Sequence, residues 1–259
     1  MSSNTQAKTP VPGHLYLVGV GPGDPELMTV KAVRILKQCP VWAVPTAKND
    51  SAGTSSALNI AQGMVDTQGR DIVRLFFPMK RVFLDAAADP GLLAAWREAA
   101  TMVLTRLDQG QDVAFPTLGD PGVYSTAFYL LSVIQEMRPD TQVSIVPGIT
   151  AMSACSAGQG RPLALGNDVL AVVPAAFEDE RLRRILTDLD AVVLMKVHKR
   201  LDTLIALLDE LHLTDQAVLI ECAGLPEERV YTDIRTARGQ ELHYFSTMLI
   251  RKKSVQVQP

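Results

Sequence analysis

Short apolar runs alternate with amphipathic segments along residues 14–137, and most runs end in a turn that contains glycine or proline. Such runs are typical of strands buried on both faces, and the segments between them have the helical period. Strands are predicted at His14–Val18, Cys39–Val44, Ile72–Leu75, Asp112–Phe115 and Gln142–Ile145, and helices at Pro25–Gln38, Ser55–Met64, Leu92–Gln109 and Val123–Met137. Right-handed crossovers between these strands would form a mostly parallel sheet.

The pattern changes near Pro147 and Gly148. Beyond them, strands are predicted at Asp168–Val173, Ala191–Lys196, Ala217–Cys222 and Leu242–Ile250, and helices at Glu178–Asp188 and Arg200–Leu211. We therefore predict two α/β domains, residues 13–147 and 148–251, with a disordered leader over residues 1–12 and a tail over residues 252–259. A ligand cleft is expected between the two domains, because such surfaces and the carboxyl ends of strands collect binding loops.

The composition argues against several classes of protein. The 259 residues are 47% hydrophobic, enough for a sizeable core, and the formal charge of −3 offers no general attraction for nucleic acid or an anionic membrane. No apolar segment approaches the roughly 18 residues of a membrane span, and the polar N-terminus does not look like a secretory signal. A cytoplasmic protein without nucleic-acid or membrane partners is expected.

The cysteines and histidines do not suggest a metal site. Cys39, Cys155 and Cys222 are odd in number and far apart, which argues against a disulfide framework or a cysteine zinc site. We expect them to be buried and reduced. His14, His198, His212 and His243 lack ligand-like spacing, so no protein-bound metal is expected.

The glycine-rich loop Gly19–Asp24, "GVGPGD", follows the first predicted strand and raises the question of a dinucleotide site. The dinucleotide fingerprint has a third glycine where this chain has Asp24, and a carboxylate there would repel a pyrophosphate. Pro22 also lacks a backbone donor. Asp24 is better suited to cap a helix beginning at Pro25. The density of glycine indicates a backbone that passes close to something flat or bulky, as in the wall of a cleft.

Two further turns repeat this arrangement. Leu118–Pro121 holds a second Gly-Asp-Pro sequence after a strand, and Val146–Ala151, "VPGITA", closes the last strand of the first domain. Because the carboxyl ends of parallel strands share one edge, all three turns are predicted to lie together there. Cations follow other apolar runs at Lys80, Arg81, Lys196, Lys199 and Arg200. Such runs are usually solvated, but some of these cations could reach a cleft and bind carboxylates.

The motifs GVGPGDPELMTVKA, TLGDPGVYST, VPGITA, VVLMKV and ECAGLPEERV occur in the order found in the tetrapyrrole methylases, which the chain resembles from Gly13 to Ile250. These are S-adenosylmethionine-dependent enzymes of sirohaem and cobalamin synthesis with a class III methyltransferase fold. FFPM, PEERV and YFSTMLI are most similar to the branch that methylates carbon 20 of precorrin-2 or cobalt-factor II. Ile149-Thr150-Ala151 departs from the Val-Ser-Ser of some members.

The resemblance implies S-adenosylmethionine as co-substrate, a tetrapyrrole substrate and a homodimer. The implied donor contacts are Pro22, Leu118, Gly119, Asp120, Val123, Thr150, Ala151, Met195 and Ala223. Substrate contacts are expected at Gly21, Gly23, Asp24, Lys80, Arg81 and Lys199. Candidates for proton handling or substrate orientation are Asp120, Tyr124, Lys196 and Glu221.

Several alternatives remain open from the sequence. A sister methylase acting on uroporphyrinogen III or a later corrin intermediate would share the donor site. The uroporphyrinogen-III methylase usually has Gly-Gly-Asp-Pro followed by a Phe-Gly-Arg segment, where this chain has Leu118 and Tyr124-Ser125-Thr126. Three other interpretations remain: a relative that modifies RNA or a protein side chain, a nicotinamide-dependent oxidoreductase, and a non-catalytic tetrapyrrole-binding protein.

Overall fold

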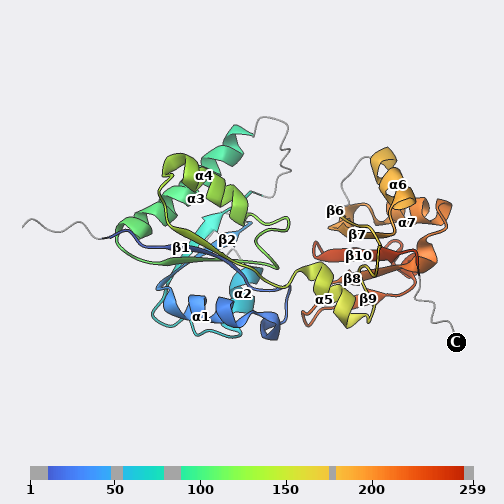
Figure 1. Ribbon diagram of the computed structural model, residues 1–259, viewed down its shortest axis with the longest axis horizontal. Helices are drawn as coiled ribbons and strands as arrows, with labels where there is room; N and C mark the ends of the chain where they lie inside the picture. Colours follow the sequence, from blue (N-terminus) through green and yellow to red (C-terminus); the bar gives the residue numbers. More distant parts are fainter. Residues whose placement is uncertain (1–10, 48–54, 79–88, 175–178, 254–259) are drawn as a thin grey trace, which may run out of the picture. The chain divides into compact units, whose positions relative to one another are not determined.

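A computed structural model of the chain describes residues 11–47, 55–78, 89–174 and 179–253 (Figure 1). The chain forms two compact units, the first ending at Ile149 and the second beginning at Thr150. Within the described residues, each unit contains one five-stranded sheet with helices packed against it. The prediction of two α/β domains is therefore confirmed, whereas the ligand cleft between them stays a prediction. The predicted leader and tail lie almost wholly outside the described residues.

The first sheet, predicted to be mostly parallel, is parallel throughout. Its strands are β1 (Leu15–Gly19), β2 (Val41–Thr46), β3 (Asp71–Phe76), β4 (Val113–Thr117) and β5 (Val143–Val146). They lie in the order β3-β2-β4-β1-β5. Gly19 of β1 pairs with Thr117 of β4, so both strands end at the same edge.

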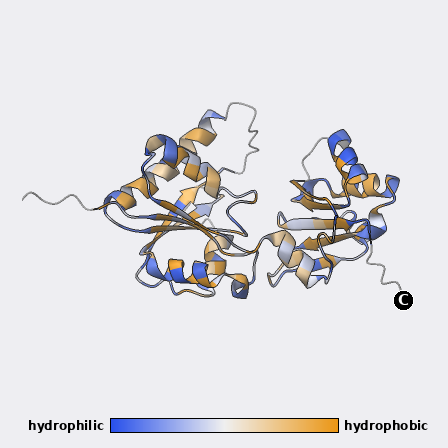
Figure 2. Ribbon diagram, in the orientation of Figure 1, coloured by the Kyte–Doolittle hydropathy of each residue, from blue (hydrophilic) through white to orange (hydrophobic). Residues whose placement is uncertain are grey.

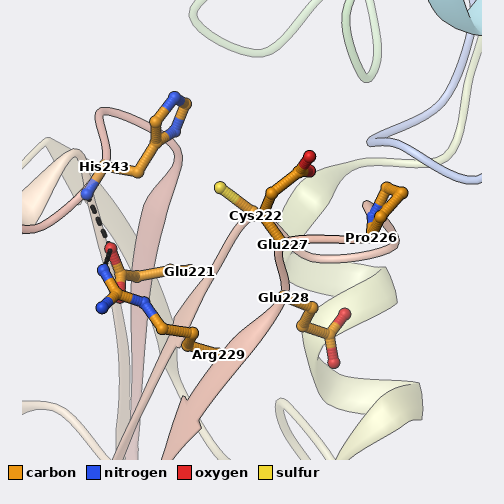
Figure 3. Close-up of a pocket in the computed structure, with 7 residues that line it drawn as sticks. All are labelled: Glu221, Cys222, Pro226, Glu227, Glu228, Arg229 and His243. Atoms are coloured by element: carbon orange, nitrogen blue, oxygen red, sulfur yellow. Dashed lines mark hydrogen bonds and ion pairs between the residues drawn. The ribbon is translucent and has the colours of Figure 1, made fainter.

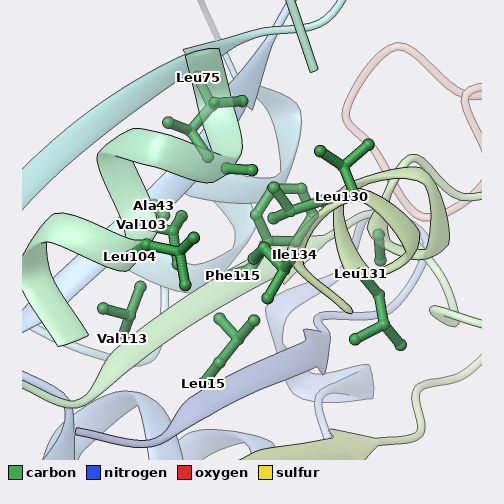
Figure 4. Close-up of a cluster of buried hydrophobic side chains, with 14 of the residues drawn as sticks. Leu15, Ala43, Leu75, Val103, Leu104, Val113, Phe115, Leu130, Leu131 and Ile134 are labelled. Atoms are coloured by element: carbon green, nitrogen blue, oxygen red, sulfur yellow. The ribbon is translucent and has the colours of Figure 1, made fainter. Parts of the chain in front are cut away.

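Helices cover both faces of this sheet. They are α1 (Val30–Gln38), α2 (Ser56–Gln62), α3 (Pro90–Asp108) and α4 (Ala127–Met137). Helices α3 and α4 pack on one face, and α1 and α2 pack on the other (Figure 1). Figure 4 shows Phe115 of β4 against Leu130 and Ile134 of α4, all fully buried. Burying such a side chain stabilises the fold by about 1.5–3 kcal/mol.

Two helices begin later than predicted. The helix expected at Pro25–Gln38 is a short 3₁₀ helix, Pro25–Leu27, capped by Asp24, followed by α1 from Val30. Thr29 is extended and caps α1 by accepting a hydrogen bond from the backbone of Ala32, so the two helices are separate. The helix expected from Val123 begins at Ala127, because Tyr124 has a φ of 50°, which a right-handed helix excludes.

The second sheet is mixed. Its strands are β6 (Leu170–Pro174), β7 (Ala191–Met195), β8 (Ala217–Glu221), β9 (Arg229–Tyr231) and β10 (Ser246–Arg251), in the order β6-β7-β10-β8-β9. β10 runs antiparallel to both of its neighbours, β7 and β8. The strand predicted at Leu242–Ile250 begins only at Ser246. β9 was not predicted.

Three helices pack on the second sheet: α5 (Ala151–Gly158), α6 (Asp179–Asp188) and α7 (Leu201–Glu210). Leucines of α6 and α7 form the core on one face, and Cys155 of α5 lies in a smaller cluster with Val193, Val218, Ile220 and Leu249. Apolar residues follow the strands of both sheets in Figure 2, whereas α6 is largely hydrophilic. Helix α5 was not predicted.

The three cysteines are buried and free, as expected. Within the described ranges, no helix combines the length and the apolar character that crossing a bilayer requires.

Candidate functional site

The loops after β1 and β4 are joined directly by their backbones. The N–H of Gly119 donates to the carbonyl of Gly21 at 2.7 Å, and the N–H of Gly21 donates back to Gly119 at 3.2 Å. Both glycines have positive φ angles, +81° at Gly21 and +69° at Gly119. This left-handed conformation favours glycine. The glycines of the two motifs therefore fix one loop against the other.

The loop after β5 completes this arrangement. A Cβ atom on Gly148 would lie 2.2 Å from the carbonyl oxygen of Gly119, and one on Gly19 would lie 2.7 Å from the same oxygen. Only glycine fits at these contacts between backbones. The three turns therefore lie together at one edge of the sheet, as predicted. The glycines of these turns allow the backbone of one loop to pass close to the backbone of the next. The contact roles of Gly19 and Gly148 were not predicted.

Asp120 ties two of these loops together. Its Oδ1 accepts a hydrogen bond from the N–H of Gly122 at 2.7 Å, and its Oδ2 accepts one from the N–H of Gly148 at 2.9 Å. Both carboxylate oxygens thus serve backbone donors. This geometry gives Asp120 a role in holding the loops, and proton handling by Asp120 stays a prediction.

The charges of these three loops suit a cationic ligand better than a phosphate. Loops Gly19–Asp24, Leu118–Tyr124 and Pro147–Ile149 contain two carboxylates, Asp24 and Asp120, and no lysine or arginine. Asp24 caps the 3₁₀ helix by accepting from the N–H of Glu26 at 2.8 Å. A sulfonium nucleoside is positively charged and has no phosphate. The chemistry of these loops therefore fits S-adenosylmethionine.

The side chains around the loops are mainly apolar. Pro22 is buried, as is the backbone at Gly23, and Leu118 packs partly against the core beneath α1 and α2. Val123 is half-buried, and Tyr124 is 48% exposed. Burial raises the pKa of Tyr124, so its hydroxyl stays protonated at neutral pH and can donate a hydrogen bond.

In the second unit, the ends of β7 and β8 lie on either side of the start of β10. The N–H of Lys196 donates to the carbonyl of Ser246, and that of Cys222 donates to the carbonyl of Phe245, both at 2.8 Å. Lys196 and Cys222 have φ angles of 62° and 50°, which are uncommon in residues other than glycine. Two turns with left-handed backbone therefore share one edge of this sheet.

The remaining predicted donor contacts lie in the second unit. Met195 and Ala223 pack against the cluster that also contains Cys155 and receives Met152 of α5. Thr150 is the N-cap of α5, and Ala151 is its first residue. Thr150 caps α5 by accepting from the N–H of Ser153 at 3.2 Å. Lys199 is exposed, and Lys80 and Arg81 lie outside the described residues.

Glu221 is 1% exposed and surrounded by donors. Its Oε2 lies 2.9 Å from Nε of Arg229, and its Oε1 accepts a hydrogen bond from the N–H of His243 at 2.6 Å (Figure 3). The same Oε2 also accepts a hydrogen bond from the hydroxyl of Tyr231. A carboxylate with this many partners suits an anchor better than a proton carrier. Arg229 and Tyr231 were not predicted.

An open pocket lies beside this anchor. It is lined by Glu221, Cys222, Pro226, Glu227, Glu228, Arg229 and His243 (Figure 3). The thiol of Cys222 points toward it, and burial raises the pKa of this thiol, so Cys222 is a poor nucleophile at neutral pH.

Comparison with solved structures supports the fold. The chain superimposes on the methyltransferase CobJ with a TM-score of 0.68 at 21% identity, covering 94% of this chain and 97% of that one. It superimposes on uroporphyrin-III C-methyl transferase from Thermus thermophilus, solved with S-adenyl homocysteine, with a TM-score of 0.63 at 22% identity, covering 92% and 97%.

Curated relatives match along nearly the whole chain. Cobalt-precorrin-2 C(20)-methyltransferase of Salmonella typhimurium is 33% identical, covering 93% of this chain and 97% of the relative. Precorrin-2 C(20)-methyltransferase of a Sinorhizobium species is 35% identical, covering 92% and 95%. The family model of the Tetrapyrrole (Corrin/Porphyrin) Methylases matches residues 14–237. The resemblance seen in the order of the sequence motifs is thereby confirmed: the chain belongs to the tetrapyrrole methylases.

Proposed function

We propose that this chain transfers the methyl group of S-adenosylmethionine to carbon 20 of precorrin-2, or of its cobalt-containing form, in corrin biosynthesis. The observation that carries this proposal is the identity of 33% and 35%, over more than nine tenths of both chains, to two relatives named for methylation of that carbon. One relative is named for the cobalt form and the other for the metal-free form, so both are candidate substrates.

The loops at the edge of the first sheet are the proposed donor site of the first unit. When bound, S-adenosylmethionine supplies a methyl group already activated by its sulfonium. Gly21 and Gly119 are locked together by two backbone hydrogen bonds, and Asp120 ties the third loop to them. This arrangement fixes the wall of the site before the donor binds. The carboxylates of Asp24 and Asp120 favour a positively charged ligand there.

The protein's contribution to the reaction is chiefly orientation. A meso carbon of the ring forms a bond to the methyl carbon, the bond from that carbon to sulfur breaks, S-adenosylhomocysteine leaves, and the ring carbon loses a proton. Correct alignment of two reactants can supply about 7–11 kcal/mol of the barrier. Asp120 and Glu221 direct their oxygens at protein donors. We therefore assign substrate orientation or proton handling first to Tyr124 and Lys196.

The substrate is a polycarboxylate, so cations are needed despite the acidic average of the chain. Lys196 and Lys199 follow β7 in the second unit, and we propose that they bind substrate carboxylates. The other substrate contacts, at Gly21, Gly23, Asp24, Lys80 and Arg81, stay predictions, as do a homodimeric state and a cytoplasmic location.

Two measurements test this function. Isothermal calorimetry should detect binding of S-adenosylhomocysteine and no binding of NADH. Mass spectrometry, after separate incubation of precorrin-2, cobalt-precorrin-2 and uroporphyrinogen III with the donor, should show addition of one methyl group to precorrin-2 or its cobalt form. Methylation of uroporphyrinogen III alone would reject the carbon-20 assignment and favour the sister enzyme.

A further inference from the structure

The segment His243–Phe245, just before β10, is held from both sides. The N–H of His243 donates to the buried carboxylate of Glu221 at 2.6 Å, and the N–H of Phe245 donates to Nδ1 of His243 at 3.1 Å. The carbonyl of Phe245 accepts from Cys222 at 2.8 Å. Tyr244 lies between these fixed residues. The anchor at Glu221 therefore helps to fix the backbone on either side of Tyr244.

The ring of Tyr244 supports the side chain of Lys196. The ammonium nitrogen of Lys196 lies 5.3 Å from the ring centroid, within the range of a cation–π interaction. His198 packs against the same ring, with centroids 5.3 Å apart and planes at 70°. The Tyr244 ring thus packs against His198 and contacts the ammonium group of Lys196.

The backbone of Lys196 is strained in a way that suits a functional position. Its φ of 62° lies in the left-handed region, and its N–H is fixed to the carbonyl of Ser246 at 2.8 Å. Residues other than glycine persist in this region only where the surroundings hold them, and such positions gather at binding sites. The lysine is held at this turn both by its backbone and by its ammonium group.

The surroundings of Lys196 are positively charged. Lys199 and His243 are exposed, His198 is half-buried, and the charges of Lys196, Lys199 and His243 all act on His198. Burial lowers the pKa of His198, and the charges of Lys199, His243 and Lys196 lower it further. Within the described residues, neither Lys196 nor Lys199 forms an ion pair with a carboxylate. A cluster of this kind is complementary to an anionic ligand.

We infer that Tyr244 is a positioning residue whose ring holds the ammonium of Lys196 ready for a carboxylate of the tetrapyrrole. This inference rests on the proposed function for its substrate class. A free lysine side chain must lose much of its rotational freedom when it binds a carboxylate, and a ring that holds it beforehand reduces this entropic cost. Tyr244 therefore acts through Lys196, not on the reacting carbon.

The test compares Tyr244→Leu, which removes the aromatic face, with Tyr244→Phe, which keeps it. Lys196→Asn removes the cation with a residue that tolerates positive φ. Lys37→Gln, at the exposed last turn of α1, is the matched control for loss of one positive charge. Three quantities are measured: the Kd of uroporphyrin III by fluorescence, the Kd of S-adenosylhomocysteine by calorimetry, and kcat and KM for precorrin-2.

Tyr244→Leu should raise the Kd of uroporphyrin III and the KM for precorrin-2 by about two- to fivefold, leaving kcat near that of the wild type. Tyr244→Phe should restore both constants. Lys196→Asn should raise them by about tenfold, and adding Tyr244→Leu to it should have no further effect. Affinity for S-adenosylhomocysteine should be unchanged throughout, which also verifies folding.

The inference is overturned if Tyr244→Leu leaves the Kd of uroporphyrin III unchanged, if it acts equally with and without Lys196, or if Tyr244→Phe is as impaired as Tyr244→Leu. Failure of the proposed function looks different. In that case the wild type methylates neither precorrin-2 nor cobalt-precorrin-2, while the effect of Tyr244→Leu on uroporphyrin binding is still present and still depends on Lys196.

Discussion

The Oδ2 atom of Asp120 lies 2.9 Å from the backbone nitrogen of Gly148, which donates a hydrogen bond to it from 28 residues further along the chain. The same carboxylate accepts from Gly122 through its other oxygen. One side chain thus joins the turn after β4 to the turn after β5. In a glycine-rich site whose loops offer few side chains, such a link fixes the shape of the backbone.

Replacing Asp120 tests this link. Asp120→Ala leaves the N–H groups of Gly122 and Gly148 without their acceptor, and we expect it to lower the free energy of unfolding by about 1–3 kcal/mol. Affinity for S-adenosylhomocysteine should fall as well. Asp120→Asn retains one carbonyl oxygen and should be intermediate in both urea unfolding and calorimetry. A fully stable Asp120→Asn with normal affinity but greatly reduced kcat would instead indicate proton transfer by Asp120.

Gly148→Ala tests the contact between loop backbones. The added Cβ would lie 2.2 Å from the carbonyl oxygen of Gly119, so the loops must move apart. We expect a loss of roughly 2 kcal/mol in stability, as for overpacking elsewhere, and weaker donor binding. Gly158→Ala is the control, because its Cβ meets nothing within 4 Å. Equal melting temperatures for Gly148→Ala and the wild type would contradict the close packing.

Glu221→Gln separates an anchor from a proton carrier. The amide can accept at only one atom, so the donors Arg229, Tyr231 and His243 lose part of their bonding. Because Arg229 is half exposed, most of the cost comes from the other donors, and we expect a loss of roughly 2 kcal/mol. Glu227→Gln, at an exposed position in the same pocket, should be neutral. A stable Glu221→Gln with kcat reduced by orders of magnitude would favour proton handling.

Acid should weaken the second unit through Asp168. The backbone N–H of Leu165 and the guanidinium of Arg251 lower the pKa of Asp168 below its usual value. A carboxyl whose folded pKa is depressed stabilises the protein above the unfolded pKa, about 3.9, and loses this effect as the pH falls through the folded pKa. Asp168→Asn should therefore be less stable at pH 7.

In urea titrations at several pH values, the difference between Asp168→Asn and the wild type should shrink as the pH drops below about 4. Asp188→Asn, an exposed substitution near the end of α6, provides the control. A difference that stays constant from neutral to acid pH would contradict this assignment.

The first sheet could be predicted closely from the sequence. Its central strands are buried on both faces, so each is a continuous apolar run, as at Val113–Thr117 and Val41–Thr46. Helix starts were harder. Asp24-Pro25 has the signals of a helix N-terminus, but these residues begin only a 3₁₀ turn. The N-cap of α1 is Thr29, directly before Val30. Local signals cannot distinguish two successive caps.

Several elements of the second unit could not be predicted from the hydrophobic periodicity of the sequence. β9 spans only Arg229–Tyr231 and is largely exposed, so it has no apolar run, and the small residues of Ala151–Gly158 give little helical pattern. The antiparallel pairing of β10 depends on contacts between distant segments. For the same reason the roles of Gly19, Gly148 and Tyr244 became evident only from contacts across the fold.

The position of the new methyl group tests the account most directly. Precorrin-2 and cobalt-precorrin-2 are incubated separately with the protein and S-adenosylmethionine carrying a carbon-13 methyl, and each product is examined by NMR. We predict one labelled methyl, bonded to the meso carbon at position 20. A label on a peripheral pyrrole carbon would contradict carbon-20 methylation by this chain. So would two unlabelled rings, from precorrin-2 and from cobalt-precorrin-2, under conditions where the donor binds.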